Sequence, residues 1–317
     1  MAKNTNENNI VERLLSGDRR ALARVISKIE REDEEAKGIV AEVYPKTGNA
    51  ITIGFTGPPG VGKSSIIAKL VKLYRAEEKS VGIVSVDPSS PFSKGAILGD
   101  RIRLSDHFLD SGVFIRSMGS RGHLGGLAGG SRLAALAMEA AGFDVVLYET
   151  VGVGQGEVEV ASAADTVVLA LQPGSGDAVQ ALKAGVMEIA DVFCINKADN
   201  PQAKNMKSEV RQILEIGHEL DPDPWFPPIV LTRGDNGEGV EELKKEIENH
   251  RAHLEKTGKM EERRRAAMKE FVVSWATSRL EKEMKDRLNE EDAEMMEEVY
   301  KRRLDPISAS EKIYREV

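Results

Sequence analysis

A short glycine-rich stretch constrains the fold of this chain more than any other feature. Residues 57–64 read GPPGVGKS, which fits the pattern G-x-x-x-x-G-K-[ST], and they lie between a β-branched run and a segment with helical spacing. In such a loop the backbone amides surround phosphate oxygens, and the dipole of the following helix favours negative charge. Lys63 would reach the β- and γ-phosphates of a nucleotide, and Ser64 would offer its hydroxyl to Mg²⁺. The predicted phosphate-binding residues are Gly57, Pro58, Pro59, Gly60, Val61, Gly62, Lys63, Ser64 and Ser65.

From residue 50 to about residue 238, short apolar runs alternate with helix-length segments. Such connections favour crossovers between parallel strands, and runs without polar alternation are typical of strands covered on both faces. We predict an α/β fold: a doubly wound, mostly parallel sheet of the P-loop NTPase type, with N-terminal and C-terminal helical extensions. The predicted strands are Ile51–Thr56, Val81–Val86, Gly112–Ile115, Asp144–Tyr148, Thr166–Leu171, Val192–Asn196 and Pro228–Thr232.

Helical spacing marks both ends of the chain. It predicts one amphipathic helix over residues 10–36, and it continues in charge-dense sequence after about residue 238, with a last short helix from about Ser308. We therefore divide the chain into an N-terminal helical arm over residues 1–48, a P-loop domain over residues 49–240 and a C-terminal helical extension over residues 241–317.

Charge and composition exclude several classes of partner. With 44 Lys and Arg against 52 Asp and Glu, the net charge is −8, whereas nucleic-acid binding is driven by an excess of basic side chains. The first ten residues lack the basic and apolar stretches of a signal peptide, and nowhere do 18 apolar residues run together. The single cysteine, Cys194, cannot form an internal disulfide. We expect a cytoplasmic protein that binds neither nucleic acid nor membranes.

A second motif, Asn196-Lys197-Ala198-Asp199, follows an apolar run. Guanine presents an N1–H and a 2-amino group, and a fixed carboxylate at Asp199 would accept both hydrogen bonds. Adenine would leave that carboxylate unpaired, which a site built in this way strongly penalises. Lys197 would lie along the nucleotide, and Asn196 would tie the base loop to the phosphate loop. The motif predicts guanine recognition.

A third motif is an apolar run that ends in an acid, Glu149, with Gly152 three positions on. In P-loop enzymes an acid here lies near Mg²⁺, and the glycine amide senses the γ-phosphate. Glu149 would hold a metal-bound water or position the attacking one, and Gln155 is a weaker candidate for orienting water. Flexibility alone is the alternative explanation for the glycines of this loop.

Two aspartates between these motifs, Asp87 and Asp100, follow the second predicted strand. Either could approach Mg²⁺ or its water, because hard cations prefer oxygen ligands, although Asp87-Pro88 also suits a simple turn. The glycine-rich stretch Arg116–Gly130 resembles a mobile loop, and a metal role for His123 within it is disfavoured. We see no cluster of cysteine and histidine for a transition metal.

Together these residues resemble the MeaB/ArgK family of GTPases, which includes the methylmalonic aciduria type A protein. The segments that carry the resemblance are DPSSP with the later ILGD, GHLGGLA, ETVGVGQ and PGSGDAVQALKAGVMEIAD, together with the early GDRRALARVIS and the late DPISASEKI. The chain departs from the family pattern after Pro91, at Arg101, and at Thr232-Arg233, where the guanine loop usually reads Ser-Ala.

The resemblance implies binding of GTP or GDP with Mg²⁺, and GTP hydrolysis. We expect a slow basal rate because no arginine finger can be assigned. It implies metal-linked residues at Ser64, Asp87, Asp100 and Glu149, and guanine contacts from Asn196, Lys197, Asp199, Thr232 and Arg233. The residues expected to act in hydrolysis are Lys63, Glu149, Asp100 and Gln155. The resemblance also implies a nucleotide-sensitive segment around Asp177, Gln180 and Lys183.

Family members serve adenosylcobalamin-dependent acyl-CoA mutases, chiefly methylmalonyl-CoA mutase, as chaperones that gate cofactor loading and reactivation. Many are homodimers through helical arms, so the C-terminal extension is the expected dimerisation arm. Two alternatives stay open: a kinase-type ATPase linked to amino-acid transport, and a GTPase that delivers metal to a metalloenzyme.

Overall fold

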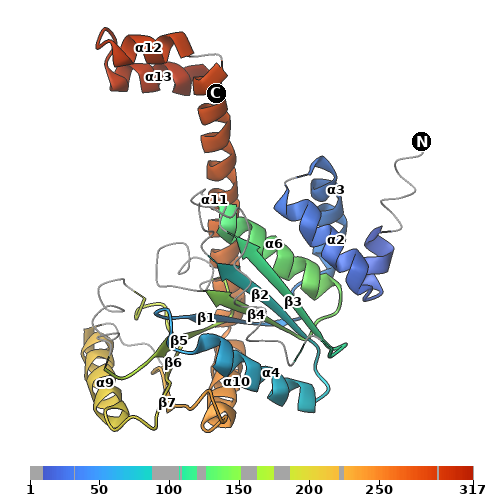
Figure 1. Cartoon of the computed structure of the whole chain (residues 1–317), viewed down its shortest axis with the longest axis vertical. Coiled ribbons are helices and arrows are strands. Elements are labelled where there is room, and N and C mark those ends of the chain that lie inside the picture. The colour runs from blue at the N-terminus through green and yellow to red at the C-terminus, as the bar shows by residue number, and fades with distance from the viewer. Residues whose placement is uncertain are drawn as a thin grey trace.

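The centre of the protein is a seven-stranded parallel sheet (Figure 1). A computed structural model describes residues 10–31, 33–87, 107, 109–119, 126–150, 163–174, 186–220, 225–290 and 293–316. Its strands are β1 (Ile51–Thr56), β2 (Val81–Asp87), β3 (Val113–Gly119), β4 (Val145–Thr150), β5 (Thr166–Leu171), β6 (Val192–Ile195) and β7 (Ile229–Leu231). Their order is β3-β2-β4-β1-β5-β6-β7, and every registered strand pair is parallel. The doubly wound α/β prediction is confirmed.

Both faces of the sheet are buried because alternate strand residues enter different cores. On one face, Ile53 and Leu147 pack with α4 (Lys63–Ala76) and α10 (Val240–Thr257). On the other, one core holds α6 (Gly126–Ala140), and a second joins β5 and β6 to α9 (Ala203–Leu220). The continuous apolar runs of the sequence thus reflect strands covered on both sides.

The N-terminal arm is not one helix over residues 10–36, so that prediction is wrong. Residues 10–15 are helical, and then come α2 (Arg19–Glu30), α3 (Glu34–Val43) and a 3₁₀ turn, η1 (Tyr44–Lys46). The break before α2 arises because the Asp18 carboxylate accepts hydrogen bonds from the backbone nitrogens of Arg20 and Ala21, which starts a new helix there. A polar cap within a periodic pattern therefore decided the local structure.

The helix α2 is fastened to the edge strand β3. Arg19 donates to the carbonyl oxygens of Ser111 at 2.7 Å and Asp110 at 3.1 Å, and Arg116 pairs with Glu30. Because Arg116–Gly119 belong to β3 and Gly126–Gly130 to α6, the prediction of a mobile loop over residues 116–130 is wrong for these parts. The rest of that stretch, with Arg121 and His123, lies outside the described residues.

The C-terminal helices are α11 (Lys259–Glu290), α12 (Ala293–Tyr300) and α13 (Pro306–Glu316). Two ion pairs fix the start of α11 to the sheet. Arg263 contacts both oxygens of Asp191 at 2.8 and 2.7 Å, and Arg264 contacts both oxygens of Asp165 at 2.7 Å. The two aspartates directly precede β6 and β5, so both pairs lie at the amino edge of the sheet.

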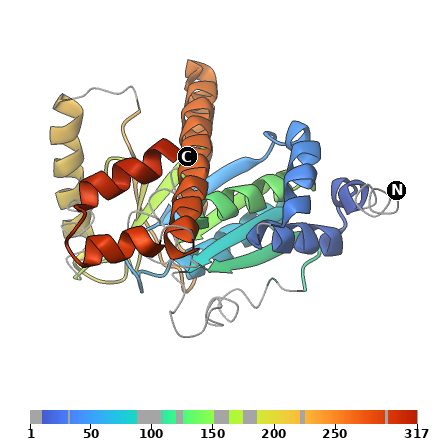
Figure 2. The same cartoon turned by 90° about the horizontal axis from the view of Figure 1, so that it is seen from above.

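Beyond this anchor, α11 extends away from the sheet, and α12 and α13 lie at its far end (Figures 1 and 2). The helix α10 falls within the predicted C-terminal extension but packs on the sheet, whereas α11 leaves it. The division into three parts stays a prediction. Among the described helices, none has the length and apolar character to cross a membrane.

Candidate nucleotide-binding site

The predicted site residues gather at the carboxyl edge of the sheet. Residues 57–62 follow β1, Glu149 lies near the end of β4, and the loops that begin at Asn196 and Thr232 follow β6 and β7. Because all these strands run parallel, their carboxyl ends meet at one edge, which is where open α/β sheets bind ligands. Motifs that are far apart in the sequence therefore form one region.

The phosphate-loop candidate connects β1 directly to α4. Gly62 has a φ of 95°, a left-handed conformation that favours glycine, and α4 begins at the next residue. Lys63 is only 6% exposed, and its Nζ donates to the carbonyl oxygen of Gly57 and, at 2.9 Å, to that of Pro58. The ammonium group is thus folded onto the loop that precedes it, at the amino end of a helix whose dipole favours anions.

The acid Glu149 is buried beside this loop. Its carboxylate accepts hydrogen bonds from the hydroxyl of Ser64 and, at 3.4 Å, from that of Ser85. A hydroxyl and a carboxylate are hard oxygen donors, so Ser64 and Glu149 fit the ligand preference of Mg²⁺. Asp87 ends β2, but its side chain lies outside the described part of the chain, as do Asp100, Gly152 and Gln155.

Ser85 is a site neighbour that the sequence reasoning missed. It is fully buried on β2, in register with Glu149 on β4. The signal was present in the sequence, because Ser85 is the one hydroxyl in the apolar run VGIVSV and lies two residues before Asp87.

Asn196 links the base-loop candidate to the phosphate loop. Its Nδ2 donates to the carbonyl oxygen of Val61 at 2.7 Å, and its Oδ1 accepts from the backbone nitrogen of Gly234 at 2.9 Å and the hydroxyl of Thr232 at 3.3 Å. A Cβ at Gly62 would lie 2.4 Å from Asn196 Nδ2, so only glycine leaves room for this contact. One buried amide therefore holds three segments together.

The next two residues continue the link. The backbone of Lys197 has a φ of 56°, which is uncommon for residues other than glycine. The Lys197 Nζ donates to the carbonyl oxygen of Gly60 at 3.3 Å. The backbone nitrogen of Ala198 donates to the carbonyl oxygen of Thr232 at 3.0 Å. Strained backbone of this kind persists where the surroundings fix it, and it is frequent at binding sites.

Asp199 and Arg233 lie at the outer rim of the same region. Arg233 Nε is 3.7 Å from Asp199 Oδ1, and the guanidinium also contacts Asp235 at 3.1 Å and Glu238 at 3.7 Å. Asp199 is 61% exposed, so its carboxylate is accessible to a ligand. The Asp199 carboxylate therefore lies beside the loops that begin at Asn196 and Thr232, and its charge remains exposed to solvent.

The fold and these loops define a P-loop α/β protein of the nucleotide-binding class. Within the described residues no group of three or more His, Cys, Asp or Glu could hold a metal ion. The site consists of the phosphate-loop candidate and one buried carboxylate, that of Glu149. The chain belongs to the family described as methylmalonyl Co-A mutase-associated GTPase MeaB, whose sequence profile matches residues 19–289.

Similar proteins agree with this assignment. A protein of Pyrococcus horikoshii named as a candidate GTPase is 45% identical over 309 residues, which is 97% of each chain. GTPase ArgK of Escherichia coli is 34% identical over 288 residues, covering 88% of this chain and 85% of that protein. The methylmalonic aciduria type A homolog of Caenorhabditis elegans is 31% identical over 284 residues, covering 84% of this chain and 71% of that protein.

A solved structure has the same architecture over nearly the whole length. The crystal structure of a LAO/AO transport system kinase covers 98% of this chain and 97% of its own, with a TM-score of 0.69 and 26% sequence identity. Together with the GTPase relatives, it shows that this protein is a P-loop GTP hydrolase that binds guanine nucleotide.

Proposed function

We propose that this GTPase is a chaperone for an adenosylcobalamin-dependent acyl-CoA mutase, with methylmalonyl-CoA mutase as the client. GTP hydrolysis would gate loading of the cobalamin cofactor and would protect or reactivate the mutase. The observation that carries this proposal is the match to the mutase-associated GTPase family over residues 19–289. The name of the C. elegans relative, a methylmalonic aciduria type A homolog, supports it.

The site residues take the following roles in this proposal. The backbone N–H groups of the non-proline residues in 57–62 and the ammonium of Lys63 hold the phosphates, and the positive charge of Lys63 stabilises the negative charge that develops during phosphoryl transfer. Ser64 and Glu149 hold Mg²⁺ or its water, together with Asp87 and Asp100. Asp199 reads guanine, while Asn196, Lys197, Thr232 and Arg233 shape the base loop. In the same proposal the Gly152 amide senses the γ-phosphate and Gln155 orients the attacking water.

A nucleotide-dependent capture experiment tests the chaperone proposal. The immobilised protein is loaded with GDP, with a non-hydrolysable GTP analogue or with no nucleotide, and it is offered purified methylmalonyl-CoA mutase. We expect retention that differs between the three states, because a switch acts through a coupling of about 1–3 kcal/mol between nucleotide and partner. Equal or absent retention in all three states, with GTP hydrolysis intact, would overturn the proposal and leave the GTPase assignment standing.

We also propose that two copies associate through the C-terminal helices. Tyr300 is 84% exposed, Ile307 72% and Tyr314 77%, and these large apolar side chains lie on or next to α12 and α13, away from the sheet. Light scattering tests this proposal, with Tyr300→Ser/Ile307→Ser as the disrupting variant and Arg265→Ala/Lys285→Ala as the control. A monomeric parent would contradict it.

The cytoplasmic location also stays a prediction.

A kinase is the second candidate function, favoured by the likeness to the solved LAO/AO transport system kinase. A kinase would transfer the γ-phosphate to an acceptor, whereas a GTPase releases it as inorganic phosphate. Incubation with γ-labelled nucleotide and cell extract separates the two. Label found only in inorganic phosphate would exclude the kinase, and label in an acceptor would establish it.

A further inference from the structure

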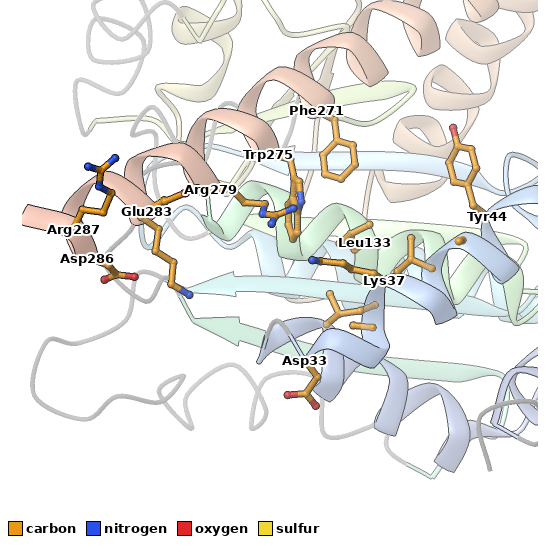
Figure 3. A pocket seen from close by; sticks show the side chains of 15 residues that line it. Asp33, Lys37, Tyr44, Leu133, Phe271, Trp275, Arg279, Glu283, Asp286 and Arg287 are labelled. Carbon is orange, nitrogen blue, oxygen red and sulfur yellow. The ribbon is translucent and has the colours of Figure 1, made fainter. Parts of the chain in front are cut away.

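A cavity of about 750 Å³ lies on the opposite side of α6 from the sheet, between α3 and α11 (Figure 3). Its volume falls within the range of small-molecule sites, roughly 300–1,000 Å³. None of the nucleotide-site residues that the structure describes lines it. The nucleotide site therefore does not account for it.

The floor of the cavity is apolar and fixed in place. Leu133 comes from α6, and Phe271 and Trp275 come from α11. The Trp275 ring lies so close to α6 that a Cβ at Gly129 would be 2.6 Å from it. Arg132 stacks over the Phe271 ring at 5.2 Å and donates to the carbonyl oxygen of Ala267, which holds α11 against α6. The aromatic wall is thus part of a packed helix contact.

Two basic side chains converge on this wall. Lys37 on α3 and Arg279 on α11 extend toward Trp275 from opposite sides of the cavity (Figure 3). Among the described residues, neither forms an ion pair or a hydrogen bond with another side chain. Asp33, the acid just before α3, points away from Trp275 in the same view. Positive charge therefore lies directly beside the aromatic floor.

This combination selects a ligand class. The apolar side chains favour a ligand with an apolar part. The two unpaired cations beside them favour an anionic group on the same ligand, because hydrogen bonds between charged groups are stronger than those between neutral ones. The other two acids of the lining, Glu283 and Asp286, lie farther along α11 than Arg279, so the charges nearest the aromatic wall are positive (Figure 3). We propose that this cavity binds a small amphipathic carboxylate, with its apolar body against Leu133, Phe271 and Trp275 and its acid group between Lys37 and Arg279.

Calorimetric titration with decanoate, below its micelle concentration, tests the proposal on the full chain. We expect saturable binding of one decanoate per chain and no comparable binding of decyltrimethylammonium, which has the same tail and the opposite charge. The double variant Lys37→Ala/Arg279→Ala should weaken decanoate binding about tenfold or more. The control Arg265→Ala/Lys285→Ala, which also removes two exposed cations from the protein, should not change it.

Tryptophan fluorescence locates the site independently. The chain has two tryptophans, Trp225 and Trp275, so a Trp225→Phe background leaves Trp275 as the reporter. Decanoate should change its emission with the same midpoint as the titration. Equal affinity for both amphiphiles, an equal loss in the two double variants, or no saturable binding would each overturn the proposal. A dimer in which the partner copy covers Trp275 and prevents decanoate from binding would also overturn the proposal.

Discussion

The side chain of Asn196 donates a 2.7 Å hydrogen bond to the carbonyl oxygen of Val61. This bond joins the loop after β6 to the phosphate-loop candidate after β1, and the other end of the same amide accepts from Gly234 at 2.9 Å. Because Asn196 is buried, its removal would leave both backbone groups without a partner and without water.

We therefore expect Asn196→Ala to lower both stability and nucleotide affinity. The free energy of unfolding should fall by about 1–3 kcal/mol, and binding of a fluorescent GDP analogue should weaken in addition. Urea unfolding and fluorescence titration measure the two effects. The control is Asn249→Ala, since Asn249 is exposed and its side chain, among the described residues, bonds only Glu246 on its own helix, α10. An Asn196 variant that matches this control would contradict the linking role.

Lys63→Ala should abolish most GTP hydrolysis. The ammonium is already held at the amino end of α4 by two carbonyl oxygens, so its loss removes fixed positive charge without unfolding the loop. We expect the rate to fall by roughly 10²–10³-fold, the usual cost of losing one preorganised donor. Phosphate-release assays at saturating GTP measure this fall, and Lys72→Ala on the same helix is the control. A rate within about twofold of the parent would refute the assignment.

Asp199→Asn should change the base that is preferred, and Lys63→Ala should not. The amide oxygen of Asn can accept from N1–H of either base, and its NH₂ group can donate to the 2-oxygen of xanthine but meets the 2-amino group of guanine as a second donor. We expect the preference for GTP over xanthosine triphosphate to drop by on the order of a hundredfold. Competition binding with both nucleotides provides the ratio, with Asp235→Asn as the neighbouring control. An unchanged ratio would show that Asp199 does not read the base.

His250 should make the protein less stable in mild acid. Burial lowers the pKa of His250 from 6.5 to about 4. The negative charge of Asp191 acts in the opposite direction and raises this pKa, whereas Arg263 and His253 lower it further. The unfolded state then binds more protons between pH 6.5 and pH 4, so stability is complete above pH 6.5 and falls as the pH drops through that window. The loss is about 3 kcal/mol at most.

Urea unfolding of the parent and of His250→Gln across this pH range checks the expectation. The variant should be less stable at neutral pH, because it loses the 2.9 Å bond between His250 and Thr166. Its stability should nevertheless depend less on pH than that of the parent. Parallel profiles for the two proteins would mean that another group titrates.

The fold was largely predictable because its signals are local. The bounds of β1 and β5 agree with prediction, since both runs are apolar and end at clear turn residues. The N-terminal arm was not predictable in the same way, because capping by Asp18 competes with an unbroken apolar period. At Gly129 the sequence indicated flexibility, whereas the structure uses the missing side chain to admit Trp275, which lies far along the chain.

The candidate site shows the same division. Its motifs were visible because each lies within a few consecutive residues. The contacts between motifs, such as Ser85 with Glu149 and Arg233 with Asp199, join residues that are far apart in the sequence. The arginine pairs that anchor α11 were invisible for the same reason, since no periodicity marks Arg263 or Arg264 among the neighbouring charges.

The forked pairs of Arg263 with Asp191 and Arg264 with Asp165 place the attachment of the C-terminal helices on the opposite rim from the nucleotide loops. The two regions share no side chain among the described residues, so they can be exchanged independently. A chimera that keeps residues 10–258 and receives the C-terminal helices of a relative needs these two arginines, and aromatic side chains that pack on α6 as Phe271 and Trp275 do, at matching positions. Such hybrids would separate the part of the chain that determines GTP hydrolysis from the part that determines the choice of partner.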